Sequence, residues 1–162
     1  MGTEILYLRD ERGEFTQASG EAVVAAAKAH LSRRVRRGTS LTSPRLVRDF
    51  LTTKLGDRDC EYFCIIAVDT RHRFIDYVEL FRGTIDGASV HPREVVKLAL
   101  TLGAASVILA HCHPSGVAEP SHADELITKR LQQALELIDV RVLDHLIVAG
   151  GDVSSFAERG LL

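Results

Sequence analysis

The chain has 162 residues, of which 46% are hydrophobic and 26% charged, and its formal net charge is −2 at pH 7. This composition is typical of a soluble globular domain with a hydrophobic core, and it excludes a disordered or fibrous chain. The apolar runs are far shorter than the roughly 20 residues of a membrane-spanning helix, and the N-terminus lacks the pattern of a secretory signal. We therefore expect a cytoplasmic protein with no membrane contact.

Residues 1–40 are expected to form an N-terminal extension of strand and helix, and residues 41–162 to form the main domain. An apolar stretch at residues 4–8, followed by a turn at residues 10–13, indicates a short strand or a hairpin. An Ala-rich helix is then predicted from about Gly20 to Arg37.

The end of this helix is strongly basic, because it carries Arg33, Arg34, Arg36 and Arg37. Gly38 follows and fits the position just after a helix, where a left-handed backbone is common. Arginines in a last helical turn interact favourably with the carbonyl end of the helix and need no ligand. The alternative is a phosphate-binding patch, for which we expect only weak contact with DNA.

The next elements are a helix over residues 43–56 and a β-hairpin. Strands at residues 60–68 and 74–81 flank the polar turn at residues 69–73. Period-two alternation on the second strand groups Glu79 with Ile75, Tyr77 and Phe81. We therefore expect Glu79 to lie on an otherwise apolar face of the sheet.

The second half of the chain alternates helices and strands. A third helix is predicted from Pro92 to a glycine cap at Gly103, and a strand that is apolar after its first residue follows at residues 106–110. A fourth helix begins at Ser121, and a last buried strand is predicted at residues 143–149. Helix-then-strand order indicates an α/β fold with a mixed β-sheet flanked by helices.

His111, His113 and Asp124 form the candidate metal site. The two histidines lie two residues apart at the end of a buried strand, so both imidazoles project to the same side. Asp124 follows in the first turn of the next helix, on the same face as Ser121. Two imidazoles and a carboxylate provide three of the four positions of a tetrahedral Zn²⁺, and an open fourth position is typical of catalytic zinc.

A structural explanation exists for some of these residues. Ser121 and Asp124 also fit a helix-capping pair, and this role is compatible with metal binding. A single histidine near an apolar strand is more often structural than a ligand. Two histidines at a strand end followed by a capped acidic helix favour metal binding.

The spacing His111-x-His113-x7-Ser121-x-x-Asp124 resembles the JAMM motif of the JAB/MPN metalloprotease superfamily. Sequences around it, over roughly residues 40–162, are similar to the RadC branch of that superfamily. They are the segments at residues 79–85, 91–95, 113–116, 143–145 and 155–162.

This resemblance implies a three-layer α/β/α, cytidine-deaminase-like fold with zinc bound by the two histidines and the aspartate. It also implies Glu79 as the general acid/base and Ser121 as an oxyanion stabiliser. Spacing alone does not select Glu79. Among Glu61, Glu79 and Glu94, only Glu79 matches the family pattern.

The chain departs from the branch at two positions near the motif. Cys112 stands between the two histidines, and strand alternation should point it away from the metal as a packed thiol. His122 follows Ser121 and could offer a competing nitrogen. The three cysteines form no Cys-x-x-Cys pair, so we expect no disulfides. Residues 1–40 also lack the glycine hairpin of the helix-hairpin-helix region found in full-length RadC proteins.

The resemblance implies a zinc-dependent hydrolase of the metallopeptidase or isopeptidase type, in which zinc-activated water attacks an amide bond of an unidentified peptide or protein. The alternative is a non-catalytic zinc-binding accessory protein in DNA repair or mobile-element maintenance. A nucleobase deaminase would need His-x-Glu and Pro-Cys-x-x-Cys motifs, which the sequence lacks. Nothing in the sequence sets the oligomeric state.

Overall fold

The computed structural model describes residues 5–83 and 90–162. Position 4 of the predicted first strand and positions 84 and 85 of the family-like segment lie outside the described residues. In chain order the elements are β1 (Tyr7–Arg9), β2 (Phe15–Gln17), α1 (Gly20–Arg34), α2 (Pro44–Leu55), β3 (Tyr62–Val68), β4 (Phe74–Arg82), α3 (Pro92–Leu102), β5 (Ser106–Cys112), α4 (His122–Glu136), β6 (Arg141–Ala149) and β7 (Asp152–Ser155).

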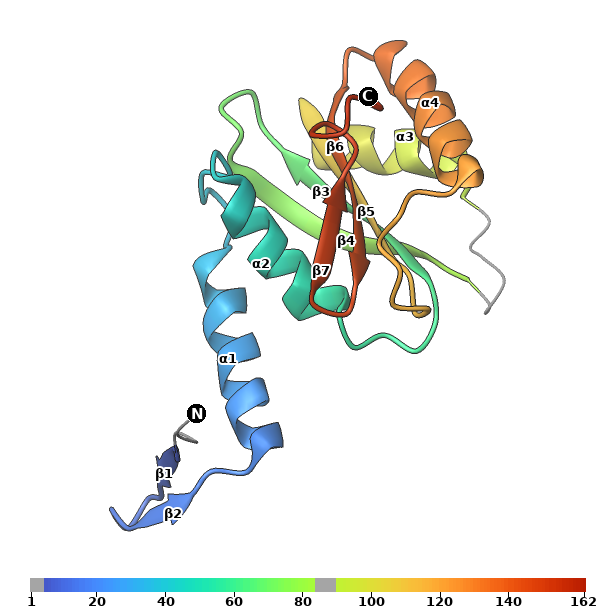
Figure 1. The fold of residues 1–162 in the computed structure, drawn as a ribbon. Helices are drawn as coiled ribbons and strands as arrows, with labels where there is room; N and C mark the ends of the chain where they lie inside the picture. Colours follow the sequence, from blue (N-terminus) through green and yellow to red (C-terminus); the bar gives the residue numbers. More distant parts are fainter. Residues whose placement is uncertain (1–4, 84–89) are drawn as a thin grey trace.

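The main domain is built on a five-stranded mixed sheet in the order β4-β3-β5-β6-β7 (Figure 1). Only the β5–β6 pair is parallel within this sheet, and the other three pairs are antiparallel. β5 is the middle strand, and every residue in it is buried. A strand covered on both faces needs apolar side chains in both alternating positions, which explains the continuous apolar run at its start.

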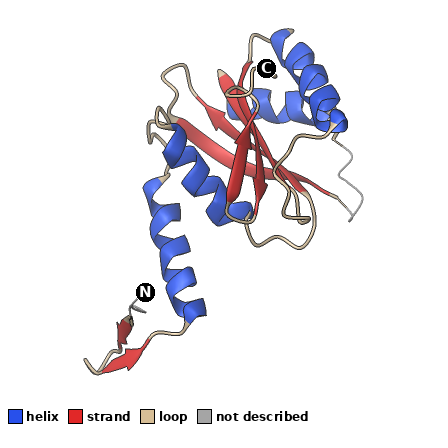
Figure 2. Cartoon of the chain, viewed as in Figure 1, coloured by secondary structure: helices blue, strands red, loops and turns tan. Residues whose placement is uncertain are grey.

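Helices cover both faces of this sheet (Figure 2). α2 packs on one face through four buried side chains, which are Val47, Phe50, Leu51 and Leu55. α3 and α4 pack on the other face through Val95, Ala99, Leu131 and Leu135. The prediction of an α/β fold with a mixed sheet between helical layers is therefore confirmed.

The N-terminal hairpin and α1 project away from the main domain (Figure 1). Of the two predicted alternatives, a short strand or a hairpin, the structure shows the hairpin, since β1 and β2 pair antiparallel. The predicted helix end is wrong, because α1 ends at Arg34 and not at Arg37. Val35 leaves the helix in an extended conformation and is only 5% exposed, so burial of its side chain in the main core ends the helix. Gly38 therefore lies in a later turn and does not cap α1.

Two β-bulges change the predicted faces of β4. Its register against β3 shifts twice, so that Ile75 and Leu80 are extra residues on the bulged strand. Beyond each bulge, the side chains of β4 point to the face opposite to the one that regular alternation predicts. Ile75 and Phe81 consequently pack on the α3/α4 side, whereas Tyr77 packs on the α2 side. The expected shared face of Glu79 with Ile75 and Phe81 is wrong.

The other predicted elements are confirmed, with small changes at their ends. Pro44 and Pro92 are the first residues of α2 and α3, and Gly103 caps α3 in the left-handed conformation. The short strand β7, which pairs with the end of β6, was not predicted. Among the described residues, no helix is long and apolar enough to cross a membrane.

Gly56 gives the fold a testable close contact. A Cβ at this position would lie 2.6 Å from the Thr52 carbonyl oxygen and 2.8 Å from the Gly150 carbonyl oxygen. The Gly56 φ of −62° suits any residue, so only the contact opposes a side chain. We expect Gly56→Ala to lower the free energy of unfolding by about 1–3 kcal/mol, as overpacking typically does.

Urea denaturation of Gly56→Ala beside Gly151→Ala checks this expectation. A Cβ at Gly151 would meet no atom within 4 Å, so that variant is the matched control. Equal unfolding midpoints for the two variants would show that the contact at Gly56 does not constrain the fold.

Candidate metal centre

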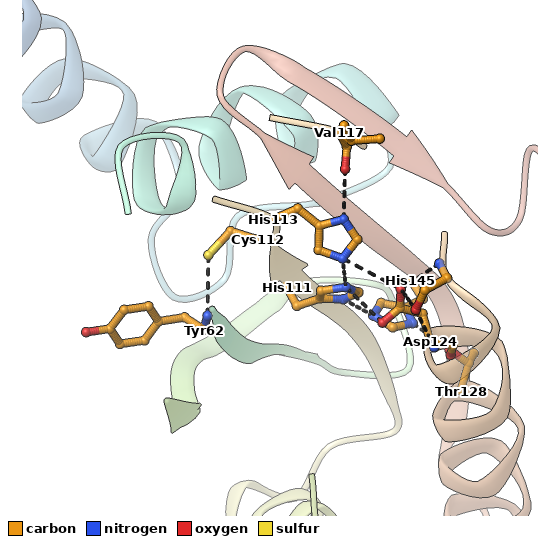
Figure 3. A network of polar contacts seen from close by, with 9 residues as sticks. Tyr62, His111, Cys112, His113, Val117, Asp124, Thr128 and His145 are labelled. Atoms are coloured by element: carbon orange, nitrogen blue, oxygen red, sulfur yellow. Dashed lines mark hydrogen bonds and ion pairs between the residues drawn. The ribbon is translucent and has the colours of Figure 1, made fainter. Parts of the chain in front are cut away.

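β5 carries the two histidines to one end of the sheet. His111 is the penultimate residue of β5 and is only 5% exposed, and its ring stacks on Phe63 of the neighbouring strand β3. His113 follows the strand, but its backbone N–H still donates to the Val148 carbonyl of β6 at 2.8 Å. The chain therefore stays aligned with the sheet beyond β5, and both imidazoles lie on the same side (Figure 3).

The N-terminus of α4 brings Asp124 to the same place. Ser121 is the N-cap, and its hydroxyl accepts from the Asp124 backbone N–H at 3.2 Å. The Ser121 backbone N–H and hydroxyl donate to Asp124 Oδ2 at 2.8 and 2.6 Å. This capping box fixes the carboxylate at the helix N-terminus, where the helix dipole also favours a negative charge.

The three side chains converge on one point. The Nε2 atoms of His111 and His113 lie 2.9 Å apart, and Asp124 oxygens lie 3.1 Å from His111 Nε2 and 3.6 Å from His113 Nε2. Ligand atoms about 2.0–2.1 Å from a tetrahedral zinc ion lie about 3.3 Å from one another. The donor set and its spacing therefore fit a zinc ion, and this is a candidate metal-binding group within the described residues.

The charges of the site already interact without a metal. Burial disfavours the charged form of Asp124, yet its hydrogen bonds with His111, His113 and Ser121 hold the pKa of this carboxyl far below its ordinary value. The hydrogen bond to Asp124 is also the main cause that raises the pKa of His113. A proton on His113 thus competes with a metal ion, since only the neutral imidazole can bind one.

Cys112 and His122 do not join the metal group. The Cys112 side chain packs on the α2 side of the sheet and accepts from the Tyr62 backbone N–H at 3.3 Å, as strand alternation predicted (Figure 3). All three cysteines are free thiols. His122 is exposed at the start of α4 and lies outside the group formed by the two histidines and the aspartate. His91 is the N-cap residue of α3.

The structure does not bring Glu79 to the metal group. Glu79 pairs with Cys64 on β3, and Cys64 packs on the same α2 side as Cys112, opposite the histidines. Its carboxylate accepts from Arg58 at 2.5 Å and from the Tyr77 hydroxyl at 3.1 Å. The assignment of Glu79 as the acid/base group therefore remains a prediction from the family resemblance, and the geometry does not support it.

Glu61 is a further carboxylate on the side of the sheet that carries the histidines. It precedes β3 by one residue, two positions before Phe63, whose backbone pairs with that of His111. Tyr62 packs on the α2 side, so alternation directs Glu61 to the side of the histidines. The negative charge of Glu61 also contributes to the raised pKa of His113. Glu61 was one of three candidates in the sequence, and Glu79 was preferred because it matches the family pattern. The β3–β5 pairing that sets the face of Glu61 is not visible in a local pattern.

These features define the class of domain: a mixed sheet between helical layers, with two histidines and an aspartate gathered at the end of its middle strand. The sequence matches the family model of the RadC-like JAB domain over residues 41–161. The chain belongs to this family, and the predicted RadC-like JAB/MPN identity and fold are confirmed.

Similar proteins share most of the chain. It is 55% identical over 150 residues to a UPF0758 protein of Aeromonas hydrophila and 57% identical over 150 residues to one of Thioalkalivibrio sulfidiphilus. Both alignments cover 93% of this chain and 67% of the relative. A UPF0758 protein of Tolumonas auensis is 52% identical, with 94% and 72% covered. These names state no activity.

The site predicts the metal content of the purified protein. We expect about one zinc ion per chain, and we expect His111→Ala and His113→Ala each to lose most of it, because one of three protein ligands is removed. Asp124→Asn should also weaken zinc retention, since it removes the charged ligand. Elemental analysis after dialysis measures the loss.

His122→Ala is the matched control for these variants, because it removes an exposed histidine two residues from Asp124 without removing a ligand. Full zinc retention in both His111→Ala and His113→Ala would show that the metal lies elsewhere.

Proposed function

We propose that the chain is a zinc-dependent hydrolase that cleaves an amide bond in a peptide or protein. The observation that carries the proposal is the set of three converging ligands, two imidazoles and one carboxylate, with a further carboxylate on the same side of the sheet. Three protein ligands leave one position of a tetrahedral ion open, which is typical of catalytic zinc and not of structural zinc.

His111, His113 and Asp124 would hold the ion. When bound, zinc supplies Lewis-acid chemistry that makes water nucleophilic near neutral pH and polarises a carbonyl oxygen. The role of the protein is to keep the three ligand atoms at a spacing of 2.9 to 3.6 Å on rigid elements, a strand end and a capped helix start.

A proton must leave the attacking water and reach the leaving amine, and a carboxylate next to the ligands can carry it. We assign this step to Glu61, because it lies on the side of the sheet that carries the histidines. Glu79 would carry the proton if the family resemblance assigned it correctly, but its carboxylate is held by Arg58 and Tyr77 on the opposite face.

Ser121 is the second group that the resemblance assigns to catalysis. Its hydroxyl donates to Asp124 Oδ2 at 2.6 Å, so its first role is to orient that ligand. This hydroxyl has only one proton, so it would have to turn away from Asp124 Oδ2 to donate to an oxyanion, and the Ser121 backbone N–H would then hold the carboxylate at 2.8 Å.

A non-catalytic accessory role, with weak DNA contact, is the second candidate function. Arg33 and Arg34 end α1, and Arg36 and Arg37 follow it, and all four side chains are exposed. A basic turn on a projecting helix could contact phosphates, but it would do so independently of the metal. This candidate predicts no effect of substitutions at Glu61 or Glu79 on function.

Paired glutamine variants separate these assignments. We expect Glu61→Gln to keep its zinc and melting temperature while hydrolysis falls by roughly 10²–10⁴-fold, the usual contribution of a general acid/base. Glu79→Gln should retain most of the activity. Mass spectrometry of new N-termini in a proteome-derived peptide library, incubated with zinc-loaded protein, provides the measurement.

The zinc-depleted His113→Ala variant sets the background of this assay. The reverse ranking, with activity lost in Glu79→Gln and kept in Glu61→Gln, would restore the assignment from the resemblance. Wild-type cleavage no greater than that of His113→Ala would count against the hydrolase and favour the accessory role.

A further inference from the structure

His145 and Thr128 form a buried hydrogen-bond chain behind His111. His145 lies on β6, is 0% exposed and stacks on Phe156 with ring centroids 4.7 Å apart. Its Nε2 is 2.8 Å from His111 Nδ1, and its Nδ1 is 2.6 Å from the Thr128 hydroxyl. The Thr128 hydroxyl in turn lies 2.5 Å from the backbone carbonyl oxygen of Asp124 (Figure 3).

The Asp124 carbonyl at the end of these hydrogen bonds determines which atom is the donor in each of them. A carbonyl oxygen can only accept, and two oxygens 2.5 Å apart need a proton between them, so Thr128 donates to Asp124 O. The Thr128 oxygen must then accept from His145 Nδ1–H. The His145 ring is fully buried, and its hydrogen-bond partners among the described residues are the Thr128 hydroxyl and His111, with no carboxylate to balance a charge, so the ring is neutral and carries no second proton.

The protonation of the other ring nitrogens, on His145 and His111, then follows. Neutral His145 with a proton on Nδ1 has a lone pair on Nε2, which can only accept from His111 Nδ1–H. The proton of neutral His111 is therefore on Nδ1. Its Nε2 keeps the lone pair that faces His113 and Asp124.

We propose that Thr128 and His145 are positioning residues that hold His111 in the tautomer whose Nε2 binds the metal. This inference rests on the metal site of the proposed function. The chain ends on the backbone of Asp124, whose side chain is another ligand of the same site. The ligand from β5 and the ligand from α4 are thus tied together through β6.

Thr128→Val tests the proposal, because it keeps the shape of the side chain and removes the hydroxyl. Hydrogen-bond partners behind a ligating histidine typically contribute 10- to 100-fold in metal affinity, so we expect Zn²⁺ affinity to fall by that factor. Thr128→Ser should restore affinity to within a few-fold of wild type. Competition for Zn²⁺ with a chromogenic chelator at neutral pH measures the change.

Thr53→Val is the matched control. The Thr53 hydroxyl donates to the Asp49 backbone carbonyl at 2.7 Å, which is the same hydrogen bond to the residue four positions earlier, and among the described residues it has no further hydrogen-bond partner. We expect Thr53→Val to keep wild-type zinc affinity. An equal loss of affinity in both valine variants would show that the effect is general destabilisation and would overturn the proposal.

The tautomer itself gives a readout that does not depend on activity. Long-range ¹H–¹⁵N NMR of the zinc-loaded wild type should show His145 protonated on Nδ1 and His111 ligated through Nε2. A His145 protonated on Nε2 would overturn the proposal even if Thr128→Val failed to fold.

The outcomes also separate this inference from the function on which it rests. If His113→Ala loses zinc while Thr128→Val keeps the wild-type Zn²⁺ affinity, the positioning role is wrong and the metal site is supported. Zinc retained in His113→Ala would remove the metal site itself, and the positioning role with it.

Discussion

The site depends on β5 being paired on both sides. β3 binds one edge of β5 antiparallel and β6 binds the other parallel, so the backbone that carries His111 has partners in both directions. Backbone hydrogen bonding with β6 continues as far as His113, whose N–H donates to the Val148 carbonyl oxygen. Histidines on such a strand end are oriented by the sheet before any metal binds, and less side-chain entropy is lost on binding.

Asp124 shows how the fold offsets the cost of a partly buried carboxylate. A buried charge is unfavourable unless it is paired and hydrogen-bonded. Here the N-terminus of α4 and the Ser121 hydroxyl and backbone N–H supply the hydrogen bonds, and two imidazoles face the same carboxylate. The capping pair and the metal ligand are the same residues, so the helix start and the site form together.

The sequence was sufficient for the local parts of this structure and insufficient for the long-range ones. The two histidines, Asp124 and the Ser121 cap could be predicted because each depends on spacing within one strand end or one helical turn. The face of Glu79 could not, since two bulges in β4 inverted the alternation that a regular strand would keep. Glu61 was considered but not selected for a related reason, because its side of the sheet follows from the pairing of β3 with β5.

Glu79 nevertheless belongs to the same structural unit as Glu61. Arg58, which pairs with Glu79, also donates to the Lys54 carbonyl and lies 4.5 Å above the Tyr62 ring. These contacts fix the segment between α2 and β3, and Glu61 is the residue of that segment next to Tyr62. The two carboxylates thus lie on opposite faces of one hairpin. Glu79 is thus linked to the segment that carries Glu61 through Arg58, whose guanidinium lies over the Tyr62 ring, and not through the metal group.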